Sequence, residues 1–250
     1  MPSTLCWIET RLDPSRSCSS LGNSLPNRRE FLFSAAVAWA ASLRAAFPEP
    51  NAIGANTAIL GYTLWDSIAL LHELGFTAIE IHPMGEIQPA ADQFPGFQFD
   101  RLSEDLKRRI RRALEPFQTV TAHLPYHNLH YFSHDRTAAE ASRRQVEIAM
   151  EGAAYFGAKL AVVHPLEPEG YPEAEGWKVM LDQLRHWGDL SSKHGFRLAA
   201  ETGYPRSVHA FVQLIRDIDH PAVGATIDVG HQSRYKELAW ISTKPIPPKI

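Results

Sequence analysis

The sequence has 250 residues, of which 44% are hydrophobic, and its formal net charge is -3. This size and hydrophobic content suit one α/β domain with a sizeable core. A net negative charge argues against a protein that binds nucleic acid through a basic surface. The one basic cluster, Lys107 to Arg112, follows Glu104 and Asp105 at helical spacing. It therefore predicts a solvated helix face rather than a phosphate-binding patch.

The first 46 residues differ in composition from the rest of the chain. They contain both cysteines, Cys6 and Cys18, so the sequence predicts neither a disulfide framework nor a cysteine-based metal site. Arg28 and Arg29 precede an apolar, alanine-rich run from Phe31 to Leu43, which is too short to cross a bilayer as a helix. This segment resembles a twin-arginine signal peptide, and an ordinary amphipathic helix is the alternative. The resemblance implies a protein that is periplasmic or otherwise exported through the twin-arginine route of a bacterium, with no stable membrane span after the signal is removed.

From about residue 58 onward, short apolar runs alternate with longer segments of helical periodicity. Gly75, Gly157 and Gly195 fall where the predicted helices should end. Strand and helix in repeated alternation predict parallel strands joined by right-handed crossovers. The predicted strands are Ala58–Thr63, Thr77–His82, Thr119–Leu124, Lys159–Leu166, Phe196–Thr202 and Gly224–Asp228.

Five consecutive predicted strands finish in side chains that bind metals or transfer protons. The acids are Glu80, Glu201 and Asp228, and the histidines are His82, His123, His164 and His231. A single histidine at a strand end is more often structural. Because all strand ends of a parallel barrel point into one funnel, however, five such ends favour a shared site. Imidazoles combined with carboxylates suit Zn²⁺, Mn²⁺ or Fe²⁺ better than Ca²⁺.

Four motifs at these strand ends, "AHLPYHNL", "VVHP", "AAETG" and "IDVGH", occur in this order along the chain. They resemble the successive strand-end motifs of the xylose isomerase-like TIM barrels, which include sugar phosphate isomerases and epimerases and endonuclease IV. The resemblance runs from about Ala58 to about Leu238. It implies an α/β fold of the (β/α)8 TIM-barrel type, occupying residues 50–250.

The resemblance also implies roles for particular residues. In the epimerase branch, Glu201 would be both a metal ligand and the catalytic acid or base, and Asp228 would be a second ligand. His231 would contact substrate in that branch. In the endonuclease branch His123, His164 and His231 would bind metal as well. The implied cofactor is a divalent ion, either Mn²⁺, Zn²⁺, Mg²⁺ or Fe²⁺.

The chemistry of these side chains favours a sugar or sugar phosphate isomerase or epimerase. Such an enzyme removes a proton from a carbon beside a carbonyl and stabilises the charge that develops. A divalent metal supplies that stabilisation as a Lewis acid, and Glu201 is the best candidate base. His82, Tyr62 and Tyr126 are candidate substrate contacts, although the tyrosines also suit barrel packing. The alternatives are an endonuclease IV-like phosphodiesterase and a degenerate barrel without catalytic activity.

The C-terminal end departs from the family pattern. An eight-stranded barrel needs two further βα units after Asp228, but only 18 residues follow Gln232. The segment "WISTKPIPPKI" has prolines and no periodicity, so it fits neither a strand nor a helix. The expected fold is therefore a barrel with about six βα units, shortened at its C-terminus. Open edges would favour pairing with a second copy, and an incomplete catalytic pair would lower turnover.

Overall fold

The computed structural model describes residues 53–234, which form a parallel sheet of six strands in the order β1-β2-β3-β4-β5-β6. The strands are β1 (Gly54–Asn56), β2 (Ala78–Ile81), β3 (Thr119–His123), β4 (Leu160–Val163), β5 (Arg197–Glu201) and β6 (Val223–Thr226). The predicted α/β alternation with parallel strands is confirmed. The cysteines, the twin-arginine segment and the "WISTKPIPPKI" segment lie outside the described residues.

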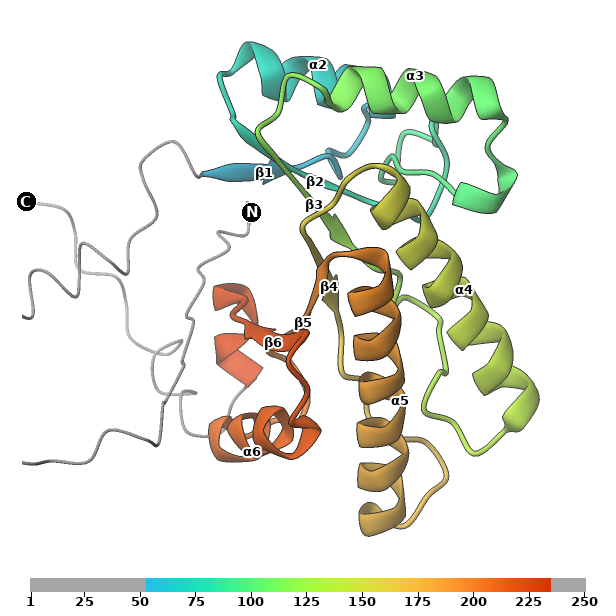
Figure 1. Ribbon diagram of the computed structural model, residues 1–250, viewed down its shortest axis with the longest axis vertical. Coiled ribbons are helices and arrows are strands. Elements are labelled where there is room, and N and C mark those ends of the chain that lie inside the picture. The colour runs from blue at the N-terminus through green and yellow to red at the C-terminus, as the bar shows by residue number, and fades with distance from the viewer. Residues whose placement is uncertain (1–52, 235–250) are drawn as a thin grey trace, which may run out of the picture.

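Five α-helices connect or follow these strands. They are α2 (Leu64–Glu73), α3 (Glu104–Leu114), α4 (Arg136–Tyr155), α5 (Glu173–His194) and α6 (Val208–Ile218), with short 3₁₀ helices η2 (Phe99–Arg101) and η3 (Val229–Arg234). In Figure 1 the helices α2 to α6 follow one another around the outside of the molecule, and the sheet lies on their inner side. No helix between residues 53 and 234 is both long and apolar enough to cross a membrane.

The helix boundaries follow local chemistry in the sequence. Four helices begin after a side chain whose oxygen accepts a hydrogen bond from a backbone amide in the first turn. These residues are Thr63, Ser103, Asp135 and Ser207. The predicted helix ends are confirmed at Gly75, Gly157 and Gly195, where φ lies between +78° and +80°. That left-handed conformation favours glycine because a Cβ atom would be strained there.

The predicted first strand, Ala58–Thr63, was wrong. The strand lies earlier, at β1, where Gly54, Ala55 and Asn56 pair in parallel with β2. The Asn56 side chain accepts a hydrogen bond from the Ala58 amide at 2.6 Å, which turns the chain away from the sheet. Leu60 in the predicted strand is 54% exposed. The apolar run therefore belongs to the loop before α2, whereas the other five predicted strands overlap the observed ones.

The sheet has two differently packed faces. Ile79 and Ile81 of β2, Val120 and Ala122 of β3, and Ala161 and Val163 of β4 belong to the main core. The alternate side chains Leu160, Val162 and Ala199 form a separate small cluster. Since successive strand residues point to opposite faces, the first set faces the helices and the second faces the barrel interior. This alternation decides which side chains reach the inner funnel.

The basic cluster on α3 is a helix face, as predicted. Lys107 pairs with Glu104 at 2.8 Å, and Arg108 approaches Asp105 at 3.4 Å. The guanidinium of Arg109 lies 4.2 Å from the ring centre of Trp65. These cations therefore interact with neighbouring side chains of the same surface. Exposed ion pairs of this kind contribute little to stability.

Candidate metal centre

The period-two alternation of the strands places the strand-end side chains on one inner face. His164 continues the inward series Leu160 and Val162, and Glu201 continues Ala199 along β5. The His123 side chain lies on the face of β3 opposite to the core residues of that strand. The three side chains therefore reach the barrel interior from adjacent strands, at the carboxyl ends where α/β proteins bind ligands.

Glu201 lies at the centre of this group. It is only 6% exposed, and its Oε2 is 3.4 Å from Nε2 of His123 and 3.4 Å from Nε2 of His164. The two imidazole nitrogens are 3.3 Å apart. One carboxylate oxygen and two ring nitrogens thus converge on a single point, within 4.8 Å of one another.

A second group shares Glu201 and comes from the end of β6. His231 Nδ1 lies 3.3 Å from Glu201 Oε1, and His231 Nε2 lies 3.5 Å from Asp228 Oδ2. Thr202 holds this group in place. Its hydroxyl accepts a hydrogen bond from the Asp228 amide at 2.9 Å, and its carbonyl oxygen is 2.7 Å from His231 Nδ1. The predicted residues Glu201, Asp228 and His231 are therefore brought together.

The donor set fits a divalent metal ion. His123 Nδ1 lies 3.2 Å from the Leu124 carbonyl, which favours a proton on Nδ1 and leaves the Nε2 lone pair directed at Glu201. Burial alone would lower the pKa of His123, but its hydrogen bond to Glu201 and the charges of Glu80 and Glu201 outweigh burial and raise this pKa. The surrounding field thus favours a positive charge at the place where His123 and Glu201 meet.

Glu80, one of the predicted strand-end acids, lies beside this cluster and pairs with the partly buried Asn56, which the sequence did not indicate. Asn56 Nδ2 donates to Glu80 Oε1 at 2.5 Å, and Glu80 is 5% exposed. Burial is the main reason that the pKa of Glu80 is raised, and the charge of Glu201 raises it further. The Glu80 side chain lies on the face of β2 opposite to Ile79 and Ile81, as the alternation along a strand requires.

The predicted substrate contacts are placed differently from one another. Tyr126 stacks on His164 with ring centres 3.8 Å apart, and the ring of His82 is 5.2 Å from that of His123. Tyr62 is 40% exposed in the loop between β1 and α2, and no contact in the described part of the chain joins it to the cluster. The geometry thus brings Tyr126 and His82 to the centre but leaves Tyr62 outside it.

His82 gives the fold a predictable sensitivity to acid. Burial, followed by repulsion from His123 and His127, lowers the pKa of His82 to about 3. Below about pH 6.5 the unfolded chain binds a proton that the folded chain excludes, so stability falls by up to about 1.4 kcal/mol per pH unit. The substitution His82→Gln should therefore reduce the stability lost between about pH 7 and about pH 5 by roughly 2 kcal/mol, measured by urea unfolding at both values.

The control is His209→Gln, which changes an exposed histidine of α6 and should leave the loss of stability unchanged. A His82→Gln protein that loses as much stability as the wild type over this range would contradict the prediction.

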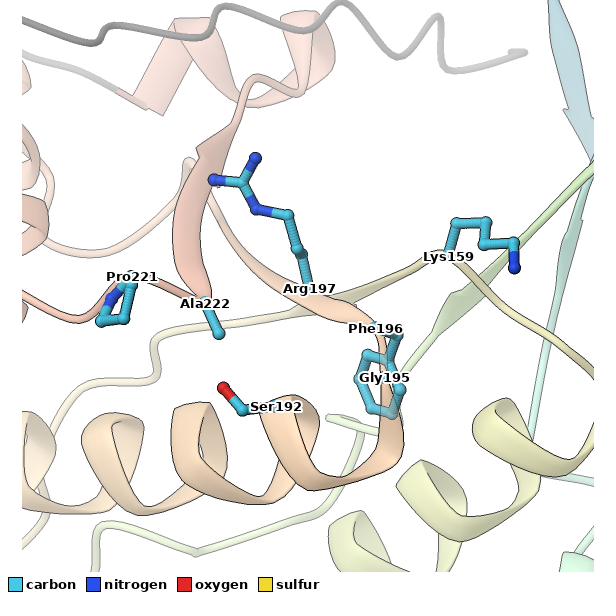
Figure 2. A pocket seen from close by; sticks show the side chains of 7 residues that line it. All are labelled: Lys159, Ser192, Gly195, Phe196, Arg197, Pro221 and Ala222. Atoms are coloured by element: carbon cyan, nitrogen blue, oxygen red, sulfur yellow. The ribbon is translucent and has the colours of Figure 1, made fainter.

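A shallow hollow lies at the other end of the strands. It has a volume of about 360 Å³ and lies where β5 and β6 begin, near Lys159, Arg197 and Ala222. Figure 2 shows that the side chains of Lys159 and Arg197 extend in different directions. They do not form a paired site for an anion, and the hollow lies away from the histidine cluster.

Solved structures with a similar fold include epimerases. A D-tagatose 3-epimerase-like protein aligns with a TM-score of 0.55 at 20% identity, over 71% of this chain and 65% of that one. D-psicose 3-epimerase with D-tagatose, from Clostridium cellulolyticum H10, aligns with a TM-score of 0.57 at 14% identity. The alignment covers 74% of this chain and 65% of that one. A xylose isomerase-like TIM barrel protein from Mycobacterium smegmatis in complex with magnesium aligns with a TM-score of 0.50 at 18% identity. The alignment covers 73% of this chain and 59% of that one.

At these identities the likeness establishes the TIM-barrel fold alone, and the chain spans less than two thirds of the length of each of these structures. No curated protein sequence matches the chain significantly. A family model described as "Xylose isomerase-like TIM barrel" matches residues 68–249.

Proposed function

Because the chain belongs to the xylose isomerase-like TIM barrel family, we propose that it is a metal-dependent isomerase or epimerase of a sugar or sugar phosphate. The observation that carries this proposal is the position of Glu201, which contacts His123, His164 and His231 at the carboxyl ends of the strands. A buried carboxylate among imidazoles can both hold a cation and exchange a proton. The epimerases among the similar structures agree with this choice of reaction.

Two overlapping sets of ligands are available for the metal. His123, His164 and Glu201 form one set, and Glu201, Asp228 and His231 form the other. A divalent ion bound there would act as a Lewis acid on the carbonyl of the sugar. Glu201 has one oxygen toward each set, so in this proposal one oxygen would hold the ion and the other would take the proton from the carbon beside that carbonyl. This dual role would give Glu201 both the ligand and the base functions.

The surrounding residues orient the substrate in this proposal. The Thr202 carbonyl fixes the ring of His231, whose other nitrogen is directed toward Asp228. The Tyr126 ring, stacked on His164, supplies an apolar surface beside the metal ligands. Flat aromatic surfaces of this kind cover the apolar face of a sugar and exclude water from it.

Exchange of hydrogen with solvent tests this proposal directly. The purified chain would be loaded with Mn²⁺, Zn²⁺, Mg²⁺ or Fe²⁺ and incubated in D₂O with a panel of ketoses, aldoses and their phosphates. Deuterium should enter the substrate at the carbon beside the carbonyl, as followed by NMR. Absence of deuterium in every sugar, with every metal, would argue against the proposed reaction.

A phosphodiesterase of the endonuclease IV type is the second candidate. The observation that favours it is the pair of overlapping ligand sets that share Glu201, because two-metal sites are common among nucleases. The net charge of -3 favours the sugar reaction, since binding to a DNA backbone is driven by lysine and arginine. Cleavage of abasic DNA by the metal-loaded chain, without sugar exchange, would favour this second candidate.

The twin-arginine segment leads us to propose that the protein is exported from a bacterial cytoplasm. Arg28 and Arg29 lie outside the described residues, so this proposal depends on the sequence pattern alone. Replacing both residues with lysine should leave an uncleaved precursor in the cytoplasm, detectable by cell fractionation and immunoblotting. Normal processing of the double-lysine variant would contradict export by this route.

A further inference from the structure

A second hollow lies outside the metal centre, between the loop that follows β4 and the beginning of α6. It has a volume of about 420 Å³. Its lining consists of acidic, aromatic and small or proline residues, namely Glu167, Pro168, Tyr171, Pro172, Glu173, Gly176, Trp177, Tyr204, Pro205 and Ala210. In Figure 1 the two helices that contribute to it, α5 and α6, lie next to each other, which agrees with their mutual contacts. A hollow of this size suits a small organic molecule.

The two carboxylates of the hollow are Glu167 and Glu173, and both are exposed. Among the side chains described between residues 53 and 231, no lysine, arginine or histidine forms an ion pair with either of them. Burial raises the pKa of Tyr204, and the charges of Glu167 and Glu173 raise it further. Both carboxylates therefore act on the same aromatic side chain, so their negative charges meet at one place in the hollow.

The aromatic walls are held in fixed positions. The Trp177 indole nitrogen donates to Asp217 Oδ2 at 3.0 Å. A Cβ atom on Gly176 would lie 2.8 Å from Pro168 and 3.4 Å from Tyr171, so glycine permits the close approach of α5 to the loop. Because the aromatic rings are already in place, a ligand would not have to order them on binding.

We propose that this hollow is a second ligand site, which takes the ammonium group of a small organic cation. Tyr171, Trp177 and Tyr204 line the hollow, and the faces of aromatic rings attract cations. Glu167 and Glu173 supply the opposite charge at the same place. A phosphate would not use this combination because the two carboxylates would repel its negative charge, whereas an ammonium group interacts favourably with both the rings and the carboxylates. None of the hollow's lining residues is one of the metal-ligand candidates, so variants of the hollow leave those ligands in place.

The test uses the full chain, freed of metal by a chelator, and two probes of the same shape. Choline carries a quaternary ammonium group. Its uncharged analogue, 3,3-dimethyl-1-butanol (called dimethylbutanol below), has a carbon atom in place of the nitrogen. Calorimetry should show that choline binds at least about tenfold more tightly than dimethylbutanol. In NMR spectra, choline should also shift the indole N–H signal of Trp177, identified by its loss in Trp177→Phe.

Paired variants separate the charge of this site from general effects. The double variant Glu167→Gln/Glu173→Gln should bind choline about tenfold more weakly, and Glu169→Gln/Glu175→Gln should stay within about twofold of wild type. The control changes two exposed glutamates of the same segment that do not line the hollow. Tyr204→Phe should retain binding because the ring remains, whereas Tyr204→Leu should weaken it about threefold or more.

Several results would overturn the proposal. Equal affinity for choline and dimethylbutanol would show an apolar hollow without selection for charge. An equal loss of binding in the two double-glutamine variants would show that the overall negative charge, rather than the hollow, attracts choline. Binding that leaves the Trp177 signal unmoved would place the cation elsewhere, and thermal unfolding of each variant would confirm that it is folded.

Discussion

Replacing Glu201 with glutamine should weaken binding of a divalent metal at least about a hundredfold. Glu201 is the one residue that belongs to both groups of candidate ligands, so its loss removes an anionic ligand from each. Losing even an outer partner of a metal ligand commonly costs ten- to a hundredfold in affinity, and a shared ligand should cost more. Competition with a chromophoric chelator would measure the affinity for Mn²⁺ and Zn²⁺.

The same substitution should act on the metal-free protein through His123. The Glu201 carboxylate is one of the charges that raise the pKa of His123, so glutamine should lower that pKa. NMR titration of the imidazole would measure this change without any catalytic assay. Glu169→Gln is the matched control, because Glu169 contacts His130 at a separate place. Unchanged metal affinity in Glu201→Gln would remove the basis of the proposed centre.

Replacing Trp187 with alanine should lower the free energy of unfolding by about 3 to 5 kcal/mol. Trp187 of α5 is completely buried, and its ring centre lies 5.2 Å from that of Tyr131 and 6.2 Å from that of Phe132. Alanine would leave a cavity between α5 and the loop after β3, because these rings cannot fill the space without moving. Urea unfolding at neutral pH would measure the loss.

Phenylalanine at position 187 should cost much less than alanine. The buried indole nitrogen of Trp187 has no hydrogen-bond partner in the described part of the chain. Phenylalanine removes this unsatisfied donor and keeps most of the ring volume, so its two effects partly offset each other. Phe94→Ala, which changes a residue that is 54% exposed, is the control with an expected effect near zero. Equal losses for Trp187→Phe and Trp187→Ala would contradict the cavity explanation.

The sequence pattern predicted most strands because their side chains combine apolar character with β-branching. The run Leu160 to Val163 is buried along its whole length, as a strand covered on both faces should be. β1 escaped prediction because Gly54, Ala55 and Asn56 carry no such pattern. Its position depends on pairing with Ala78, Ile79 and Glu80 of β2, which is a contact between distant parts of the chain. Local apolar content favoured the wrong segment nearby.

The candidate site could be predicted in composition but not in geometry. Strand-end positions together with the family resemblance indicated His123, His164, Glu201, Asp228 and His231, and the structure brings these five together in two groups that share Glu201. The supporting contacts made by Thr202 and by the pair of Asn56 and Glu80 were not predictable in the same way. They depend on the register between neighbouring strands, which the sequence does not display directly.

The alternation of side chains along each strand has a consequence for how this site can change during evolution. Inserting or deleting a single residue within β3 would exchange the places of Ala122 and His123, turning the imidazole toward the helices. A point substitution, by comparison, alters one side chain and leaves the direction of the others intact. Related chains should therefore vary in length within the loops while the strands keep a constant number of residues. Length variants made within β3 should lose metal binding even where each original side chain is still encoded.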